Sequence, residues 1–146
     1  MQIRDIMTHD VQTVAPGDTI RRAAQMMDEL NVGVLPVCDG SKLVGIVTDR
    51  DITVRATSAG LGPDSCKVSE VMTERPRYCY EDDSVIEVTR LMADRQIRRV
   101  PVVDRNDRLI GIVSLGDLAI DAKDTSAVGD ALEQISSPAQ PDRSGQ

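Results

Sequence analysis

The chain has 146 residues, 40% hydrophobic and 28% charged, which is typical of globular proteins and excludes wholesale disorder, collagen and coiled-coil structure. The formal net charge of −7 and the absence of Phe and Trp disfavour nucleic acid and anionic membranes as partners. Apolar runs such as residues 43–47 are too short to cross a bilayer and residues 1–5 do not resemble a secretory signal, so we expect a cytoplasmic protein.

Residues that would support catalysis or metal binding are scarce. His9 is the only histidine, and no Ser-His-Asp, Cys-His or metal-ligand group can be assembled around it. Cys38, Cys66 and Cys79 form no CxxC pair, so the sequence predicts neither a disulfide framework nor a zinc site. We expect the three cysteines to be small buried residues or inert thiols. Cys66 lies in a polar stretch, which leaves exposure and an intermolecular disulfide open for this residue. We expect no enzyme, no metal and no required cofactor.

The chain contains an internal repeat. Residues 6–40 align with 71–105, and residues 41–52 align with 107–118 after one extra residue, Asn106. Twelve of the 47 aligned pairs are identical, well above the chance level of about 6% set by average amino-acid usage. A unit of about 50 residues is too small to bury an adequate core alone, so we expect the two copies to pack about a pseudo-twofold axis.

The same elements are predicted in chain order in both copies. Each begins with a short strand of alternating polarity and continues into an amphipathic helix whose first residues offer N-cap side chains. Two apolar runs follow and predict a β-hairpin, after which a second helix begins. The strands are expected at 11–14 and 77–80, the first helices from Asp18-Thr19 and Asp83-Ser84, the hairpins at 34–47 and 99–113, and the second helices at 48–59 and 114–122.

These elements predict a mixed α/β (α+β) fold of two β-α-β-β-α repeats. Pro36 and Pro101 cannot donate a ladder hydrogen bond, which favours a sheet edge for the first strand of each hairpin. The expected organisation is repeat 1 at 1–59, a linker at 60–68, repeat 2 at 69–122, a short C-terminal helix at 123–136 and a disordered tail at 137–146.

The two copies share one polar motif at the end of the hairpin. Residues 45–51 read Gly-Ile-Val-Thr-Asp-Arg-Asp and residues 111–117 read Gly-Ile-Val-Ser-Leu-Gly-Asp. A hydroxyl followed three residues later by a carboxylate is typical of a helix capping box. The same geometry also suits a nucleotide, because the hydroxyl can contact a phosphate and the carboxylate can accept both hydroxyls of a ribose.

Two units that open with Met-Thr, carry an apolar-Pro-apolar strand and end in Gly-h-h-Thr/Ser-x-x-Asp, where h is hydrophobic, resemble a tandem pair of cystathionine-β-synthase (CBS) domains. The resemblance covers residues 3–122. It implies ligand binding in the clefts between the two sheets, with Thr48 and Ser114 on phosphate and Asp51 and Asp117 on ribose. By the same analogy, Pro76, Arg77 and Tyr78 would face Asp51, and Val11, Gln12 and Thr13 would face Asp117.

Charge distinguishes the copies before the proline-containing strand. Residues 97–104, Ile-Arg-Arg-Val-Pro-Val-Val-Asp, followed by the motif at 111–117, are similar to the nucleotide-sensing γ subunit of AMP-activated kinase. This resemblance implies that Arg98 or Arg99 holds the anionic end of a ligand. A pair of solvated arginines that protects a strand edge is the alternative interpretation. The equivalent residues Gly33 and Val34 are uncharged, so the site containing Asp117 is expected to bind multiply charged ligands more weakly or to stay empty.

The resemblance implies a regulatory module that binds an adenine nucleotide or adenosyl compound, with AMP, ADP, ATP, NAD and S-adenosylmethionine (SAM) as candidates. It also implies a disc-like homodimer and allows a further protein partner. Ligand binding would then change the angle between the two copies or between protomers. The alternative is a structural or interaction protein, such as a stress-related dimer, whose pockets are vestigial.

Overall fold

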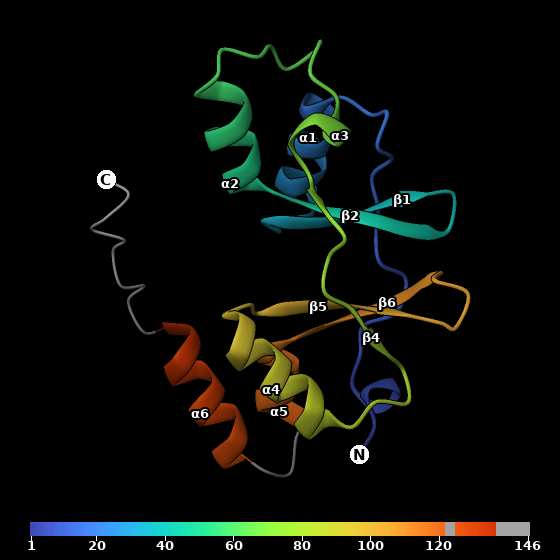
Figure 1. Ribbon diagram of the computed structural model, residues 1–146, viewed down its shortest axis with the longest axis vertical. Coiled ribbons are helices and arrows are strands. Elements are labelled where there is room, and N and C mark those ends of the chain that lie inside the picture. Colours follow the sequence, from blue (N-terminus) through green and yellow to red (C-terminus); the bar gives the residue numbers. More distant parts are fainter. Residues whose placement is uncertain (122–124, 137–146) are drawn as a thin grey trace.

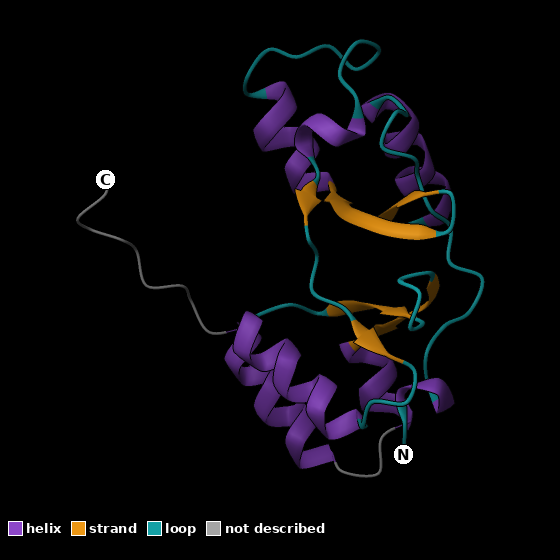
Figure 2. Ribbon diagram, turned by 45° about the vertical axis from the view of Figure 1, so that its right-hand side comes forward, coloured by secondary structure: helices purple, strands orange, loops and turns teal. Residues whose placement is uncertain are grey.

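The computed structural model describes residues 1–121 and 125–136. Two three-stranded sheets face each other, and the helices lie on their outer sides (Figure 1; Figure 2). The predicted mixed α/β fold of two similar units is therefore confirmed. The predicted tail, residues 137–146, lies outside the described residues.

Repeat 1 begins with a 3₁₀ turn, Ile3–Asp5, and its first helix is α1, Ile20–Leu30. The hydroxyl of Thr19 caps α1 by accepting from the backbone N–H of Arg22 at 3.2 Å. The hairpin consists of β1, Val34–Asp39, and β2, Lys42–Thr48. The second helix begins as α2, Asp49–Asp51, and continues as a π-helix, Ile52–Thr57.

Repeat 2 has the same order of elements and one addition. Ser84 caps its first helix by accepting from the N–H of Glu87 at 3.1 Å. A helix beyond the repeated unit, α6, packs against α4 (Figure 1). The elements are α3, Val68–Val71; β3, Thr73–Glu74; β4, Cys79–Tyr80; α4, Val85–Arg95; β5, Arg99–Val103; β6, Leu109–Ser114; α5, Leu115–Asp121; and α6, Thr125–Ser136.

Each repeat begins with a Met-Thr segment, residues 7–8 or 72–73, that pairs with the sheet of the other repeat, so the two segments are exchanged. Strand β3 pairs with β2 of repeat 1, and Thr8 forms the matching bridge to Ile112 in β6. A side chain at Gly45 would place Cβ 2.7 Å from Met72 Sδ and 2.9 Å from the Thr73 carbonyl oxygen. The shared glycine of the two motifs therefore allows the exchanged Met-Thr segment to cross the hairpin closely.

The cores show the same exchange. Ile3, Ile6 and Met7 are buried in the core of repeat 2, whereas Cys66, Val68 and Val71 are buried in the core of repeat 1. Because each core takes side chains from the segment before the other repeat, the two units depend on each other for burial.

Backbone hydrogen bonds join the two repeats at the tips of their hairpins. Lys42 and Arg108 form an antiparallel bridge there. The N–H of Leu43 donates to the Asp107 carbonyl at 3.1 Å, and the N–H of Leu109 donates to the Ser41 carbonyl at 2.9 Å. The opposite ends of the strands carry the second helices.

The predicted sheet edge is wrong for β5, which lies between β4 and β6. The prediction is confirmed for β1, which lies at the edge of its sheet and receives an isolated parallel bridge from Val14, whose N–H donates to the Pro36 carbonyl at 3.1 Å. The N–H of Cys38 in turn donates to the Val14 carbonyl at 3.0 Å. Neither hydrogen bond of this bridge uses the nitrogen of Pro36, which cannot donate. The predicted strand at 11–14 is reduced to this bridge, and that at 77–80 to Cys79–Tyr80.

Two further expectations concern exposure. The expected burial of the cysteines is confirmed. Cys66, whose exposure the sequence left open, is only 3% exposed because it packs into the core of repeat 1, which disfavours an intermolecular disulfide through it. Across residues 1–121 and 125–136, no helix combines the length and apolar character needed to cross a bilayer.

Candidate functional site

A cavity of about 1150 Å³ opens between the repeats at the end of the sheets opposite the hairpin tips. Equivalent residues of both repeats line it, among them Thr48 with Ser114 and Val34 with Arg99. A cavity lined by matched residues lies near the pseudo-twofold axis. Any molecule that fills it therefore touches both repeats.

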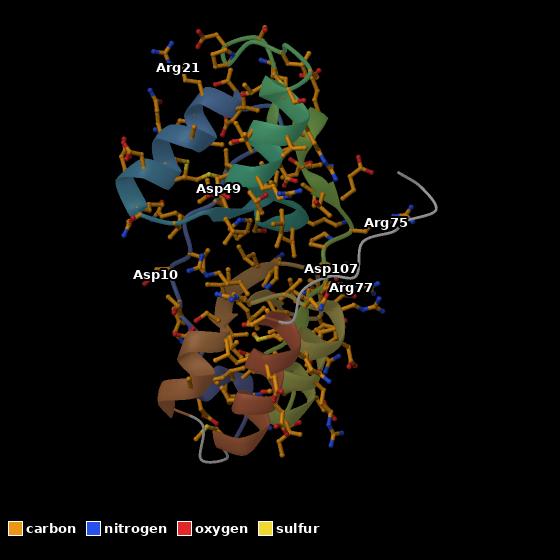
Figure 3. The ribbon with its side chains drawn as sticks, turned by 90° about the vertical axis from the view of Figure 1, so that its left-hand side faces the viewer. Asp10, Arg21, Asp49, Arg75, Arg77 and Asp107 are labelled. Carbon is orange, nitrogen blue, oxygen red and sulfur yellow. The ribbon has the colours of Figure 1, made fainter. Side chains whose placement is uncertain are left out.

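Four arginines give the cavity a positive lining: Arg98 and Arg99 lead into β5, and Arg75 and Arg77 lie on the segment that joins the repeats (Figure 3). All four side chains are exposed, and none forms a salt bridge or side-chain hydrogen bond within the described part of the chain. Asp49 is the one acidic residue among the described lining residues. The cavity is thus cationic in a protein with a net charge of −7.

The Asp49 side chain lies against Gly33, which is equivalent to Arg98 of repeat 2. The backbone N–H of Asp49 donates to the Gly33 carbonyl at 3.0 Å, and a Cβ at Gly33 would lie 2.9 Å from Asp49 Oδ2. In repeat 2 the N–H of Leu115 donates to the Arg98 carbonyl at 2.8 Å. The backbone contact is the same in both repeats, but Leu115 takes the place of Asp49 and Arg98 takes the place of Gly33.

The hydroxyl-and-carboxylate motif forms a capping box in both repeats. The N–H of Asp51 donates to Thr48 Oγ1 at 3.0 Å, and the N–H of Thr48 donates to Asp51 Oδ2 at 3.0 Å. The N–H of Asp117 donates to Ser114 Oγ at 3.0 Å, and the N–H of Ser114 donates to Asp117 Oδ2 at 2.9 Å. The capping interpretation is therefore confirmed.

The two carboxylates of the motif lie outside the described lining of the cavity. Thr48 and Ser114 line the cavity, whereas Asp51 and Asp117 are not among its described lining residues. Asp51 is also 3.8 Å from Arg55, measured from Oδ1 to Nε. A capping role uses one oxygen of each carboxylate and leaves the other as an acceptor.

The predicted partners of Asp51 are only partly brought together. Pro76 and Arg77 line the same cavity as Thr48. Tyr78 packs instead against Tyr80, with ring centroids 5.7 Å apart and ring planes at 81°, and hydrogen bonding with Tyr80 raises the pKa of Tyr78. Arg105 stacks over Tyr80 at 3.8 Å, so this aromatic pair belongs to a surface cluster outside the cavity lining.

The residues predicted to face Asp117 lie elsewhere. Val11 and Thr13 line a smaller cavity of about 310 Å³ near the hairpin tips, together with Asp10 and Ser41. Gln12 is not among the described lining residues of either cavity, and Ser114 lines the larger one. The structure therefore does not bring this second predicted group together in one cavity.

The described residues contain no group of three His, Cys, Asp or Glu side chains arranged to hold a metal ion. All three thiols are buried. Burial, with a smaller effect from Asp83, raises the pKa of Cys79 from its ordinary value of 9.0 to about 12, so this thiol stays protonated at neutral pH.

Sequence reasoning missed several residues that line the cavity. Arg75 directly precedes the predicted Pro76, and the pairing of Asp49 with Leu115 was visible in the repeat alignment. Val128 and Leu132 of α6 gave no such signal, because this helix has no counterpart in repeat 1.

The fold and the cavity define a duplicated α/β module whose halves share one cationic site. The CBS domain family model matches residues 3–56 and 68–121, and the chain belongs to this family. The chain is 43% identical to the CBS domain-containing protein YhcV of Bacillus subtilis, over 92% of this chain and 94% of that protein. It is 39% identical to Hypoxic response protein 1 of Mycobacterium tuberculosis, over 80% of this chain and 81% of that protein.

Solved structures of CBS pairs are similar to this one. Hypoxic Response Protein I, solved with two coordinated zinc ions, has a TM-score of 0.77 at 38% identity and covers 83% of this chain and 98% of its own. CBSX2 in complex with AMP has a TM-score of 0.73 at 29% identity, covering 83% and 95%. The CBS domain pair of protein MJ0100 in complex with 5′-methylthioadenosine and SAM has a TM-score of 0.72 at 31% identity, covering 82% and 94%.

Proposed function

We propose that this chain is a non-catalytic regulatory module that binds an adenine nucleotide or adenosyl compound in the larger cavity. The single observation that carries the proposal is the set of four unpaired arginines around a cavity shared by both repeats. The similar CBS pairs solved with AMP and with methylthioadenosine and SAM support adenosine as the common part of the ligand.

The charge of the cavity favours a phosphorylated ligand. Guanidinium groups bind phosphate oxygens through paired, charge-assisted hydrogen bonds, and the four here have no competing carboxylate partner within the described residues. AMP, ADP, ATP and NAD each offer phosphate oxygens, whereas SAM offers a carboxylate beside two positive groups. We therefore place the nucleotides ahead of SAM.

The shared motif supplies the neutral contacts in this proposal. The oxygen of Thr48 accepts from the Asp51 N–H, which leaves its hydroxyl hydrogen free to donate to a phosphate, and Ser114 repeats this arrangement. The second oxygen of Asp51, Oδ1, lies 3.8 Å from Arg55 Nε, so a ribose hydroxyl would share this acceptor with Arg55. Arg98 and Arg99 take the anionic end, and Pro76 and Arg77 complete the wall.

Signalling follows from the position of the cavity. A ligand there contacts both repeats, so it favours the relative angle that gives the best contacts and shifts the population toward it. We also propose that two copies form a homodimer, as the resemblance to CBS pairs implies. Sedimentation analysis with and without ADP tests both the assembly and its response to ligand.

The test of the function is calorimetric titration with AMP, ADP, ATP, NAD and SAM, supported by thermal shift. Arg98→Ala and Arg99→Ala should each weaken nucleotide binding about 10- to 100-fold, because each removes a hydrogen-bonded charge. Arg90→Ala is the matched control, since Arg90 is exposed on α4 and does not line the cavity. Absence of binding by all five compounds would refute the proposal and favour an interaction role without ligand.

A further inference from the structure

The outer end of the larger cavity has an apolar wall made by two helices. Leu115 and Ala119 come from α5, and Val128 and Leu132 come from α6. The second CBS match ends at residue 121, so α6 lies beyond the part of the chain that the family describes. The wall is also one-sided, because repeat 1 has no helix equivalent to α6.

Helix α6 is firmly packed, yet one large apolar side chain on it is not covered. Val128 and Ala131 are buried in the core of repeat 2, and Gln96 Nε2 donates to the Gln134 carbonyl at 3.2 Å. Leu132, one turn after Val128, lines the cavity and is 47% exposed. An exposed leucine on the wall of a cavity is suited to contact a ligand.

The polarity and charge of the lining residues differ along the length of the cavity. Ile46 of β2 and Pro76 line it on the side of repeat 1, and the apolar wall of α5 and α6 lines it on the other side. The start of β5, where Arg98 and Arg99 lie, is between β2 and these two helices (Figure 1). The arginines at the start of β5 thus lie beside the apolar α5–α6 wall, whereas Pro76 on the other side lies between Arg75 and Arg77.

The size of the cavity agrees with this division. Its volume of about 1150 Å³ lies above the usual range for small-molecule pockets, which is roughly 300–1,000 Å³. A mononucleotide bound at the arginines and Ile46 would leave Leu132 uncovered. A ligand with a second ring system beyond its phosphates would reach both ends.

We infer that the α5–α6 wall is an outer subsite for the second nucleoside of a dinucleotide. The pyrophosphate lies against Arg98 and Arg99, the first nucleoside lies toward Ile46 and Pro76, and the second base packs on Leu132 and Val128. This assignment rests on the proposed function and specifies its ligand class as a dinucleotide rather than a mononucleotide.

The test compares NAD with ADP, because both carry two linked phosphates but only NAD has a second nucleoside. Leu132→Ala should weaken NAD binding about five- to tenfold, the effect of removing apolar contact from one aliphatic side chain, and leave ADP binding within about twofold. Ile86→Ala is the matched control, since Ile86 is also 47% exposed but lies on α4 outside the cavity lining. Arg99→Ala should weaken both compounds.

Hydrogen exchange provides a second measurement. NAD should slow amide exchange in α6 more than ADP does at equal saturation, because only NAD contacts this helix. Binding of ADP without NAD, or equal effects of Leu132→Ala on both compounds, overturns the outer subsite while the proposed function stands. If the unaltered protein binds none of AMP, ADP, ATP, NAD and SAM, the proposed function itself fails.

Discussion

The two repeats have nearly the same backbone but different chemistry where they meet. Thr19 and Ser84 cap equivalent helices, and Asn31 and Gln96 end those helices in the left-handed conformation with φ of 54° and 53°. Both repeats also have a left-handed residue just after the exchanged Met-Thr segment, Asp10 in the first and Arg75 in the second. These shared features show which positions maintain the fold.

The differences gather on the cavity. Repeat 1 offers Gly33 and Asp49 where repeat 2 offers Arg98 and Leu115, although the backbone hydrogen bond between each pair is the same. Helix α6 adds an apolar wall to repeat 2 alone. Residues that are matched in the two repeats therefore maintain the fold, and residues that differ give the cavity its uneven charge and its apolar wall.

The largest expected effect is at the shared glycines. Gly45→Ala and Gly111→Ala should each lower the free energy of unfolding by about 1–3 kcal/mol, measured by urea denaturation, because the added Cβ overpacks the exchanged segment. At Gly111 it would lie 2.8 Å from the Thr8 carbonyl oxygen and 2.9 Å from Met7 Sδ. Similar losses at the two sites would strengthen the equivalence of the repeats.

Gly17→Ala is the control for this pair. Nothing lies within 4 Å of a Cβ at Gly17, so the free energy of unfolding should stay within about 0.5 kcal/mol. Unchanged stability in the Gly45 and Gly111 variants would contradict the close crossing of the exchanged segment.

The second-largest expected effect is at Cys79, a buried residue whose equivalent in repeat 1 is Val14. The folded protein holds the Cys79 proton to about pH 12, whereas the unfolded chain releases it above about 9.0, so stability falls as pH rises through this window. Between pH 8 and pH 10 this thiol should remove about 1.4 kcal/mol. Cys79→Val, which copies Val14, should abolish that part of the alkaline loss while changing stability at pH 7 by less than about 1.5 kcal/mol.

Urea denaturation at both pH values measures the difference between the variant and the unaltered protein. Cys38 and Cys66 also have raised pKa values because of burial, so a smaller alkaline loss should persist in the variant. An identical pH dependence in the two proteins would show that the Cys79 thiol is not held neutral by the fold.

The smallest effect tests the charge difference within the cavity. Asp49→Asn removes the one carboxylate among the described lining residues and should strengthen ADP binding about two- to fivefold, as expected for a charge in a solvent-exposed cavity. The gain should shrink at high salt. Asp28→Asn, which removes an exposed charge on α1 outside the cavity lining, should leave affinity unchanged in the same titration. Weaker binding by the Asp49 variant would contradict an anionic ligand.

Much of the fold could be predicted because the same local sequence patterns occur in both repeats. The capping residues Thr19 and Ser84 and the two hairpins follow from spacing alone. The prediction for Pro101 failed because the partner of β5 comes from a segment before the helix, and pairing across that distance leaves no local signal. The exchange of Thr8 and Thr73 between sheets is non-local for the same reason.

The candidate site was predictable in part. Thr48 and Ser114 were predicted from the motif, and Arg98 or Arg99 was implied by the resemblance to the γ subunit; all four line the cavity. Tyr78 lies elsewhere because its ring has an aromatic partner in Tyr80, a contact that residue order does not reveal. Leu132 was not predicted because α6 occurs in repeat 2 alone, so no equivalent residue of repeat 1 could point to it.

The bridge between Lys42 and Arg108 has a mechanical consequence. Because the hairpin tips are joined by backbone hydrogen bonds, they hold one end of the junction together, and the arginine-lined cavity lies at the other end. In the proposed mechanism, a change in the angle between the repeats would therefore separate the second helices more than the tips. A ligand in the cavity would then be sensed at the helical surfaces.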